Sequence, residues 1–410
     1  MLDVRLIREN PDLVRRSIQS KGIDPKLVDE FLVLDLKWRG LRKELDDFLA
    51  EQKKFSQARD IEAGKANKEG VKIKEAELAD IETERGSLLH QFPNLPFDDV
   101  PRGKDETANK ILREVGEKPQ FDFTPKDHLE LGEKLDLVDV AKAAEVSGSR
   151  FGYLKNEAVL LEFGLVKLAL DTVMPEGFTP VVPPVMIRPE VFQGMGRLAG
   201  DEKEERYYLE KDKVYLTGSA EHTLGPLHMN EVLEVKTLPR RYVGFSTNFR
   251  REAGSYGKDT HGILRVHQFD KVEMFSFVEP QESEKEHEFL LSIQEKLMQK
   301  LHLPYRVLEL CTGDMGWTDA RQYDIETWMP SQDRYRETHS CSNTTDYQAR
   351  GVNVKYRKKD GETDFVHMLN ATAFAIGRTI IAIMENFQTK DGKIKVPHIL
   401  QPYVDKEIIG

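Results

Sequence analysis

The chain has 410 residues, of which 39% are hydrophobic and 32% are charged, and its formal net charge is −11. This length allows two or three domains with at least one large core, and the acidic balance excludes an overall positive field that would attract nucleic acid. The two cysteines, Cys311 and Cys341, are too few for a disulfide framework and lack CxxC metal-ligand spacing. No stretch is apolar enough for a signal peptide or a membrane span, which makes the cytoplasm the expected location.

The first long predicted element is a helix over residues 27–55. Its apolar side chains recur at alternating steps of four and three residues, which is the heptad seam of a coiled coil. A weaker seam over residues 71–92 follows Gly64 and Gly70, two glycines that are expected to interrupt the helix. The simplest arrangement is an antiparallel hairpin whose first helix, of about 37 residues, is about 55 Å long. The seam consists of Leu27, Phe31, Leu34, Trp38, Leu41, Leu45, Phe48 and Phe55.

The predicted turn of this hairpin carries a charge opposite to that of the whole chain. Residues 52–74 contain seven lysines and arginines against three acids, which is a local charge of +4. Charge clusters on exposed coiled coils are usually only solvated, but this reversal of sign favours an arm that binds an anion.

Prolines at positions 93, 96, 101, 119 and 125 predict a linker after the hairpin. Beyond it, strand-like segments and helices follow each other without regular βαβ alternation, which indicates an α+β fold with an antiparallel sheet. The chain has no GxxxxGK(S/T) loop and no GxGxxG turn before a helix, so a P-loop or a Rossmann turn would not hold a nucleotide. Extended segments are expected at 177–187, 213–221, 240–252 and 323–343, and helices at 283–301 and 371–387.

Residues 240–275 form a predicted β-hairpin around a glycine-rich loop. On its second strand Arg265, Phe269 and Glu273 recur every four residues, so they share one face at the strand period of two. Phe269 and Glu273 would stand about 13 Å apart. A cation, an aromatic plane and a carboxylate in this order suit an elongated ligand with a phosphate, a base and an amine. The alternative is a hairpin whose polar face is only solvated, opposite an apolar face of Leu264, Val266, Val272 and Met274.

Four further side chains have the chemistry to hold a nucleoside triphosphate. Arg250 follows the first strand and has the planar fork that suits a phosphate. Glu337 and Ser340 carry the hard oxygen ligands that Mg²⁺ prefers. Arg378 lies in a predicted apolar helix, where a buried charge needs an anionic partner. That partner is either a γ-phosphate or a structural salt bridge, and both alternatives stay open.

Over nearly its whole length the chain is similar to the bacterial-type seryl-tRNA synthetases, a class II family. The start MLDVRLIRENPDLV and the hairpin resemble the tRNA-binding arm of that family, and GFTPVVPP (177–184) resembles its first motif, an element of the dimer interface. FRREAGSYGKDTHGILRVHQFDKVEMF (249–275) resembles the second motif, and LNATAFAIGRTIIAIMENFQ (369–388) resembles the third. The resemblance implies an N-terminal antiparallel coiled-coil hairpin and a class II catalytic domain on an antiparallel sheet flanked by helices.

The resemblance also implies domain boundaries and an activity. Residues 1–100 would form a tRNA-binding domain with the hairpin at about 27–92, residues 101–130 a linker, and residues 131–410 the catalytic domain. The enzyme would be a serine–tRNA ligase, which uses ATP and Mg²⁺ to convert L-serine to seryl-adenylate and then transfers the seryl group to tRNA(Ser). It would be a cytoplasmic homodimer without zinc or membrane attachment, and tRNA(Sec) stays open as a second substrate.

Carried over by position, the resemblance makes Arg250, Glu273 and Arg378 the catalytic residues. Arg250 would clamp the α-phosphate and the serine carboxylate, and Arg265 with Arg378 would hold the β- and γ-phosphates. Phe269 would stack on adenine, and Glu273 would line the pocket for the serine hydroxyl.

The other implied contacts belong to four sets. The serine pocket would also include Ser219, Ala220, Glu221, Asn370 and Thr372. ATP would also contact Arg251, Glu252, Val266, Glu337, Thr338, His339 and Ser340, although His339 has no specific role. Glu337 and Ser340 would bind Mg²⁺. The contacts to tRNA would come from Lys53, Lys54, Arg59, Lys65 and Lys68.

Three positions depart from the usual motifs of the family. Ser219 stands where threonine is usual, His339 where serine is usual, and Ala371 where glycine is usual. Each motif keeps the polar group most needed, so the departures bear on amino-acid selectivity rather than on activity.

Three rival functions remain. An amino acid:carrier-protein ligase of the same fold is expected to lack an arm, and the seam over 27–55 argues against it. An inactive paralogue is disfavoured because Arg250, Glu273 and Arg378 are all present. A synthetase for another small amino acid, such as threonine, is disfavoured by the lack of a Cys/His zinc set and of a further C-terminal domain.

Overall fold

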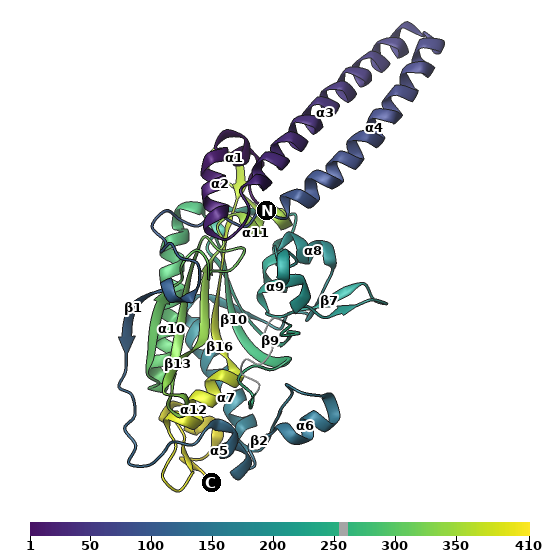
Figure 1. Cartoon of the computed structure of the whole chain (residues 1–410). Coiled ribbons are helices and arrows are strands. Elements are labelled where there is room, and N and C mark those ends of the chain that lie inside the picture. The colour runs from purple at the N-terminus through teal and green to yellow at the C-terminus, as the bar shows by residue number, and fades with distance from the viewer. Residues whose placement is uncertain (254–260) are drawn as a thin grey trace. The chain divides into compact units, whose positions relative to one another are not determined.

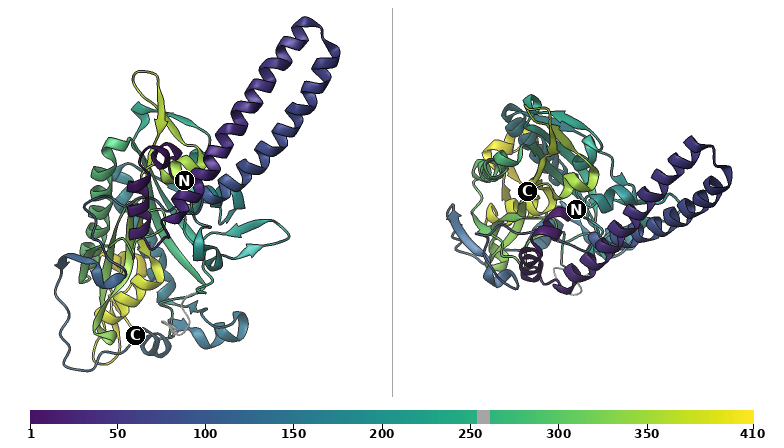
Figure 2. Two further views of the ribbon diagram at one scale, coloured as in Figure 1. Left: turned by 45° about the horizontal axis from the view of Figure 1, so that its top comes forward. Right: turned by 90° about the horizontal axis from the view of Figure 1, so that it is seen from above.

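The computed structural model describes residues 1–253 and 261–410, so the middle of the predicted glycine-rich loop, 254–260, lies outside the described residues. The chain divides into two compact units, Met1–Leu95 and Pro96–Gly410 (Figures 1 and 2). None of the helices in the described parts of the chain is long and apolar enough to cross a membrane.

The first unit consists of helices α1 (Val4–Glu9), α2 (Pro11–Ser20), α3 (Lys26–Ala58) and α4 (Ile61–Leu89). Helices α3 and α4 run side by side as an antiparallel hairpin, which is clear in Figure 1 and in both views of Figure 2. The turn between them needs only Arg59, which has a left-handed φ of 57°, and Asp60, whose side chain caps α4 by accepting from the Ala63 N–H. At the base of the hairpin a separate small core includes Ile7, Ile18, Val28, Phe31 and Phe92.

The prediction that two glycines interrupt the hairpin is wrong. Gly64 and Gly70 lie inside α4, which runs without a break from Ile61, and α3 has 33 residues rather than about 37. A Cβ at Gly70 would lie 2.6 Å from the Phe48 ring. The glycine therefore lets the aromatic side chain of α3 pack directly on α4, and this packing offsets the low helix propensity of glycine.

The second unit is built on an eight-stranded sheet with the order β1-β11-β12-β13-β16-β10-β9-β4. All neighbouring strands are antiparallel except β4 and β9, which are parallel. The strands are β1 (Lys110–Val115), β4 (Phe178–Val181), β9 (Arg240–Phe249), β10 (Gln268–Val278), β11 (Tyr305–Glu309), β12 (Arg321–Met329), β13 (Arg334–Asn343) and β16 (His367–Ala375).

Shorter elements surround this sheet. The small strands are β2 (Val138–Asp139), β3 (Tyr153–Leu154), β5 (Met186–Ile187), β6 (Tyr208–Leu209), β7 (Val214–Leu216), β8 (Val232–Glu234), β14 (Lys355–Arg357), β15 (Thr363–Phe365), β17 (Ile394–Lys395) and β18 (Ile408–Ile409). The short helices are α5 (His128–Lys134), α6 (Val140–Ser147), α8 (Pro189–Gly194), α9 (Glu221–Leu224), α11 (Tyr347–Val352) and α13 (Gln401–Val404).

The two faces of the sheet differ in polarity. Helices α7 (Glu157–Val173), α10 (Ser283–Leu301) and α12 (Ile376–Asn386) pack on one face and form the main core with alternate strand residues such as Val272 and Met274 (Figure 1). Because side chains alternate along a strand, the intervening residues of β10 lie on the other face. That second face carries the candidate site.

Two predicted elements differ in the structure. Residues 371–375 belong to β16 rather than to the predicted helix 371–387, because they pair with β10 from Ala371↔Met274 to Ala375↔Lys271. A short apolar run fits a buried strand as well as a helix, and here the pairing with β10 makes it a strand. Strand β10 begins only at Gln268, so residues 264–267 approach the sheet as irregular backbone, although Leu264 and Val266 still pack with Val272 and Met274 in the main core.

Candidate active site

A cavity of about 450 Å³ opens on the polar face of the sheet. It brings together residues from β10, β12, β13, β16 and the start of α12 with residues of the segments 197–222, 250–252 and 263–266. The predicted residues that line it are Ser219, Glu221, Arg250, Glu252, Arg265, Val266, Phe269, Glu337, Thr338, Ser340, Asn370, Thr372 and Arg378. Four other predicted residues, Ala220, Arg251, Glu273 and His339, lie outside its lining.

Strand β10 supplies an aromatic ring and an ion pair to this region. Phe269 and Lys271 line the cavity, and Lys271 Nζ lies 2.6 Å from Glu273 Oε2. The Glu273 side chain is fully buried, and burial raises the pKa of its carboxyl group against the opposing effect of Lys271. Besides this ion pair, neither carboxylate oxygen has an aligned hydrogen-bond donor among the described residues. Lys271 was not among the predicted site residues, although the strand period that groups Phe269 with Glu273 places it between them on the same face.

A small polar pocket lies beside this pair. Thr372 pairs with Glu273 across the β10–β16 ladder, and Asn370 lies two residues earlier on β16. Asn370 is 3% exposed, and its Nδ2 has no hydrogen-bond acceptor among the described residues. A buried amide donor without a partner is costly unless a ligand satisfies it. The pocket is therefore suited to a small molecule with a hydroxyl group.

Glu221 provides a buried negative charge in the cavity lining. Its carboxylate lies 2.6 Å from Arg197 Nη2 and accepts a 2.9 Å hydrogen bond from Gln348 Nε2. Burial acts to raise the pKa of Glu221, but Arg197 and Gln348 outweigh it, and the net shift is downward. An ionised carboxylate in a cavity binds an ammonium group. Arg197, which lines the same cavity, was not predicted because its partner is distant in sequence.

Arginines dominate the part of the cavity around Phe269. The Arg250 guanidinium lies 5.2 Å from the centroid of the Phe269 ring, and its Nε donates to Gly218 O at 3.2 Å. Arg265 forms an ion pair with Glu252. The ring offers a stacking surface, and the guanidinium groups offer charge-assisted donors for phosphate oxygens.

Arg378 has the salt bridge that the sequence analysis offered as one alternative. Its Nη1 lies 3.3 Å from Glu337 Oε2 and donates to Glu337 O at 2.8 Å. The Arg378 side chain is 28% exposed and also lines the cavity, so the salt bridge leaves part of the guanidinium open to a ligand. A structural salt bridge and a contact with a γ-phosphate are therefore compatible at Arg378.

Glu337 and Ser340 both line the cavity on β13, and Asp324 lies opposite Ser340 on β12. Burial and the neighbouring Glu337 carboxylate raise the pKa of Asp324, which indicates that these acids crowd one another. A divalent cation relieves such crowding, so the oxygen donors fit Mg²⁺. No group of three His, Cys, Asp or Glu side chains in residues 1–253 and 261–410 is arranged as a metal site, but Mg²⁺ commonly uses one or two carboxylates together with substrate phosphates.

Three predicted residues that do not line the cavity, His339, Ala220 and Arg251, make contacts elsewhere or are buried. His339 is buried, its Nδ1 lies 2.8 Å from Thr338 Oγ1 and its Nε2 lies 3.0 Å from Ala373 O. Burial lowers the pKa of His339 to about 4, so the ring is neutral and part of the packing between strands. Ala220 is fully buried, and Arg251 is exposed with its backbone N–H donating to Glu205 O.

The five residues predicted to contact tRNA lie in the first unit, around the turn of the α3–α4 hairpin. Lys53 and Lys54 are in the last turns of α3, and Arg59 follows that helix. Lys65 and Lys68 are in the first turns of α4. All five side chains are exposed.

Comparisons with known proteins agree with both units. Residues 1–96 match the family model "Seryl-tRNA synthetase N-terminal domain", and residues 205–387 match "tRNA synthetase class II core domain (G, H, P, S and T)". The serine–tRNA ligase of Dictyoglomus turgidum is 45% identical, and the alignment covers 98% of each chain.

Two solved structures are similar over the whole chain. The seryl-tRNA synthetase of Pyrococcus horikoshii, in complex with ATP, has a TM-score of 0.93 and 40% identity and is covered to 99%. The cytoplasmic serine–tRNA ligase of Naegleria fowleri, in complex with AMP, has a TM-score of 0.89 and 32% identity and is covered to 98%. On this full-length similarity, the chain belongs to the seryl-tRNA synthetase family of class II aminoacyl-tRNA synthetases.

Proposed function

We propose that this chain activates L-serine with ATP to seryl-adenylate and transfers the seryl group to tRNA(Ser). The observation that carries the proposal is a single cavity in which a pocket suited to a hydroxyl amino acid adjoins an arginine-lined region around Phe269. Amino acid and nucleotide can therefore meet with their reacting ends side by side.

Serine would bind through its ammonium and hydroxyl groups here and through its carboxylate at Arg250. The ionised Glu221 would accept the ammonium, and Asn370 and Thr372 would contact the hydroxyl with Glu273 behind them. The pairing of Lys271 with Glu273 places a positive charge at the same pocket. A site built on such polar groups rejects analogues without a hydroxyl, because its buried donors and acceptors then stay unpaired.

ATP would occupy the arginine-lined region, with adenine on Phe269 and along the backbone of Val266. In the first step a serine carboxylate oxygen attacks the α-phosphorus, and the bond to the pyrophosphate oxygen breaks. Arg250 would stabilise the charge that develops on the α-phosphate, while Arg265 and Arg378 hold the leaving pyrophosphate. This displacement needs no side-chain nucleophile, because positioning and charge stabilisation lower the barrier.

Glu337 and Ser340 would hold Mg²⁺, which supplies charge neutralisation at the triphosphate when it is bound. The oxygen donors of Glu337 and Ser340, both on β13 and both in the cavity lining, support this assignment. With or without Mg²⁺, Phe269 and the arginines would orient the nucleotide.

In the second step a terminal ribose hydroxyl of the tRNA takes the seryl group from the adenylate. The exposed basic residues of the hairpin turn would bind the tRNA backbone. We propose a tRNA-binding domain at 1–100, a linker at 101–130 and a catalytic domain at 131–410, and the division of the chain after Leu95 supports the first boundary. The expected homodimer and cytoplasmic location remain predictions, and tRNA(Sec) stays open as a second substrate.

Amino-acid-dependent ATP–pyrophosphate exchange across all twenty amino acids tests the proposed function. Serine should support exchange far above alanine and glycine, since both lack the hydroxyl. Charging of purified tRNA(Ser) and tRNA(Sec) then tests the second step. Exchange that is supported best by threonine or alanine would contradict the proposal.

A further inference from the structure

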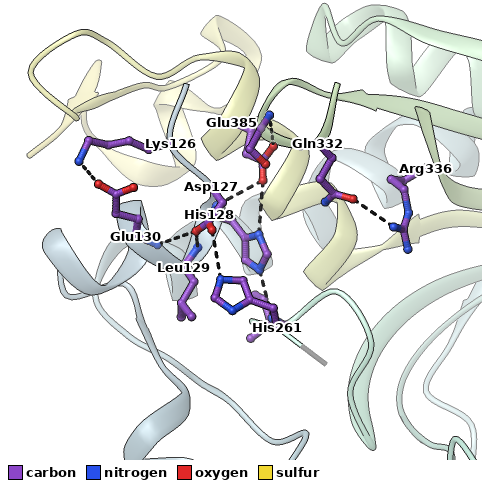
Figure 3. Close-up of polar contacts among 12 residues, drawn as sticks. Lys126, Asp127, His128, Leu129, Glu130, His261, Gln332, Arg336 and Glu385 are labelled. Atoms are coloured by element: carbon purple, nitrogen blue, oxygen red, sulfur yellow. Dashed lines mark hydrogen bonds and ion pairs between the residues drawn. The ribbon is translucent and has the colours of Figure 1, made fainter. Parts of the chain in front are cut away.

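The buried ring of His128 connects three separate parts of the second unit (Figure 3). His128 is the first residue of α5 and is 3% exposed. Its Nε2 accepts a 3.2 Å hydrogen bond from the Ile263 N–H, and its Nδ1 lies 3.4 Å from Oε1 of Glu385 on α12. The ring therefore links α5 and α12 to the backbone that leads into β10.

These contacts determine the tautomer and the orientation of the ring. Because Nε2 accepts a hydrogen bond, the single proton of the neutral ring must be on Nδ1, where it faces Glu385. Glu385 is fully buried, and its carboxylate also accepts from the backbone N–H groups of His128 and Ser331 at 3.2 and 3.1 Å. A flipped ring would lose both hydrogen bonds.

The ring also lies very close to the backbone next to Ile263. Gly262 has a φ of +70°, and a Cβ at this position would lie 1.9 Å from His128 Nε2. Only glycine combines this conformation with this approach. The contact between the ring and residues 262–263 is therefore closely fitted.

Residues 263–266 are the part of the cavity wall that this contact supports. All four line the cavity, but they precede β10, and the β9–β10 ladder ends at the pair Phe249↔Gln268. Besides the His128 hydrogen bond, the polar contacts of this segment include the 3.4 Å hydrogen bond from Arg378 Nε to Leu264 O and the ion pair of Arg265 with Glu252. Ile263 and Leu264 also pack in the main core. Because the segment has no ladder hydrogen bonds, the N–H of Ile263 depends on a side chain, His128, for its acceptor.

We propose that His128 is a positioning residue for ATP: its Nε2 holds the backbone at Ile263 and thereby places Arg265 and Val266 against the nucleotide. His128 does not line the cavity and touches no substrate in this scheme. The inference rests on the proposed function, and it adds a residue that acts on ATP through the cavity wall.

Two substitutions of His128 separate positioning from mere packing. His128→Gln places an amide oxygen near the position of Nε2 and keeps an acceptor for the Ile263 N–H, whereas His128→Phe keeps an aromatic ring and removes the acceptor. In the exchange assay His128→Phe should raise KM for ATP about tenfold or more and leave KM for serine within about twofold, since a lost hydrogen bond and a displaced Arg265 both weaken ATP binding. His128→Gln should stay within about threefold of the unchanged protein for both substrates.

A third variant reaches the same contact from the other side and leaves His128 and Glu385 themselves unsubstituted. Gly262→Ala pushes the backbone away from the His128 ring and should reproduce the rise in KM for ATP, even where His128→Phe folds poorly. His261→Ala is the matched control, because His261 has a 66% exposed side chain and pairs with Asp127 (Figure 3). Its exchange kinetics should not change.

The proposal is overturned if His128→Gln loses as much ATP affinity as His128→Phe. It is also overturned if KM for serine rises as much as KM for ATP, or if Gly262→Ala leaves KM for ATP unchanged. Failure of the unchanged protein to exchange with serine would instead contradict the proposed function, so the two failures are distinguishable.

Discussion

The ammonium of Lys271, which lines the cavity, and the carboxylate of Glu273, which lies outside the lining, form an ion pair with 2.6 Å between Nζ and Oε2. Both residues are buried, at 7% and 0% exposure, and they are two positions apart on β10. Two charges are stable at such a site only as a pair, because each alone would lack solvation. The same pair makes the proposed serine pocket polar. We therefore expect it to affect both the stability of the fold and the selection of serine.

We therefore expect different results from single and double substitutions of this pair. Lys271→Met leaves Glu273 without its partner and should destabilise the fold by about 3–5 kcal/mol in urea unfolding. Glu273→Ala should lower kcat/KM for serine at least about tenfold, since a hydrogen bond to a charged group contributes about 1.5–3 kcal/mol. The double variant Lys271→Met/Glu273→Leu should recover most of the stability and none of the activity. If Glu273→Ala leaves kcat/KM for serine unchanged, Glu273 is not part of the serine-binding site.

Arg250→Ala and Arg378→Ala should nearly abolish adenylate formation in folded protein. Both guanidinium groups line the cavity where the phosphates are proposed to bind, and their charge supports the transition state more than the ground state. Glu337→Gln removes the acidic partner of Arg378 and keeps the guanidinium, so it separates the salt bridge from phosphate binding. Single-turnover adenylate formation and thermal melting are the measurements. A variant that melts early but keeps its activity per folded molecule would show that the arginine is structural.

Glu162 on α7 should make stability depend on pH. Burial, the charge of Asp270 and a hydrogen bond with it raise the pKa of Glu162 to about 8. The folded state therefore holds a proton that the unfolded state releases near pH 4.5, and the resulting stabilisation is lost as pH rises through about 8. Glu162→Gln, whose amide can still donate to Asp270, should raise the melting temperature relative to the unchanged protein more at pH 9 than at pH 6.

The exposed Glu190→Gln is the control for this measurement and should show no such difference. An equal melting-temperature change for Glu162→Gln at both pH values would mean that Glu162 does not hold a proton in the folded protein.

Neutralising Lys53, Lys54 and Arg59 to glutamine should weaken tRNA binding. If each contacts one phosphate, the slope of log affinity against log salt should fall by about 2 to 3, because fewer counterions are released. Filter binding of tRNA(Ser) at several salt concentrations measures the slope. Neutralising three exposed lysines of the second unit, Lys211, Lys285 and Lys359, controls for net charge. A similar loss in both triple variants would argue against a specific arm.

Shortening the arm should separate the two reaction steps. Residues 42–78 can be replaced by a short Gly/Ser turn that preserves the contacts below it, the Arg85–Asp35 salt bridge and the Trp38 hydrogen bond to Glu82. Exchange with serine should persist, because no proposed active-site residue lies in the arm, whereas charging of tRNA(Ser) should be lost. Undiminished charging by the shortened protein would exclude the hairpin as the tRNA-binding element.

A mixed dimer shows which active site each arm serves. One subunit has the shortened arm and an intact site, and the other has an intact arm and Arg250→Ala. If the arm reaches across the dimer, the intact arm delivers tRNA to the live site and charging persists. Charging that disappears while exchange continues would mean that each arm serves its own subunit.

The sequence by itself determined the features that depend on local periodicity and on motifs. The heptad steps from Leu27 to Phe55 predicted the hairpin, because a seam read along one helix needs no knowledge of the rest of the fold. The alternation of Phe269 and Glu273 predicted one strand face, and the three motifs indicated the family. These features extend over a few turns or a few strand positions.

The tertiary structure alone decided what depends on contacts between distant residues. Gly70 remains helical because Phe48 packs on it, and residues 371–375 form a strand because they pair with β10. The Ile263 N–H finds its acceptor in His128, 135 residues earlier in the chain. Local sequence could not predict such a partner, since a side chain selects a buried hydrogen bond only after the fold has brought both groups together and excluded water.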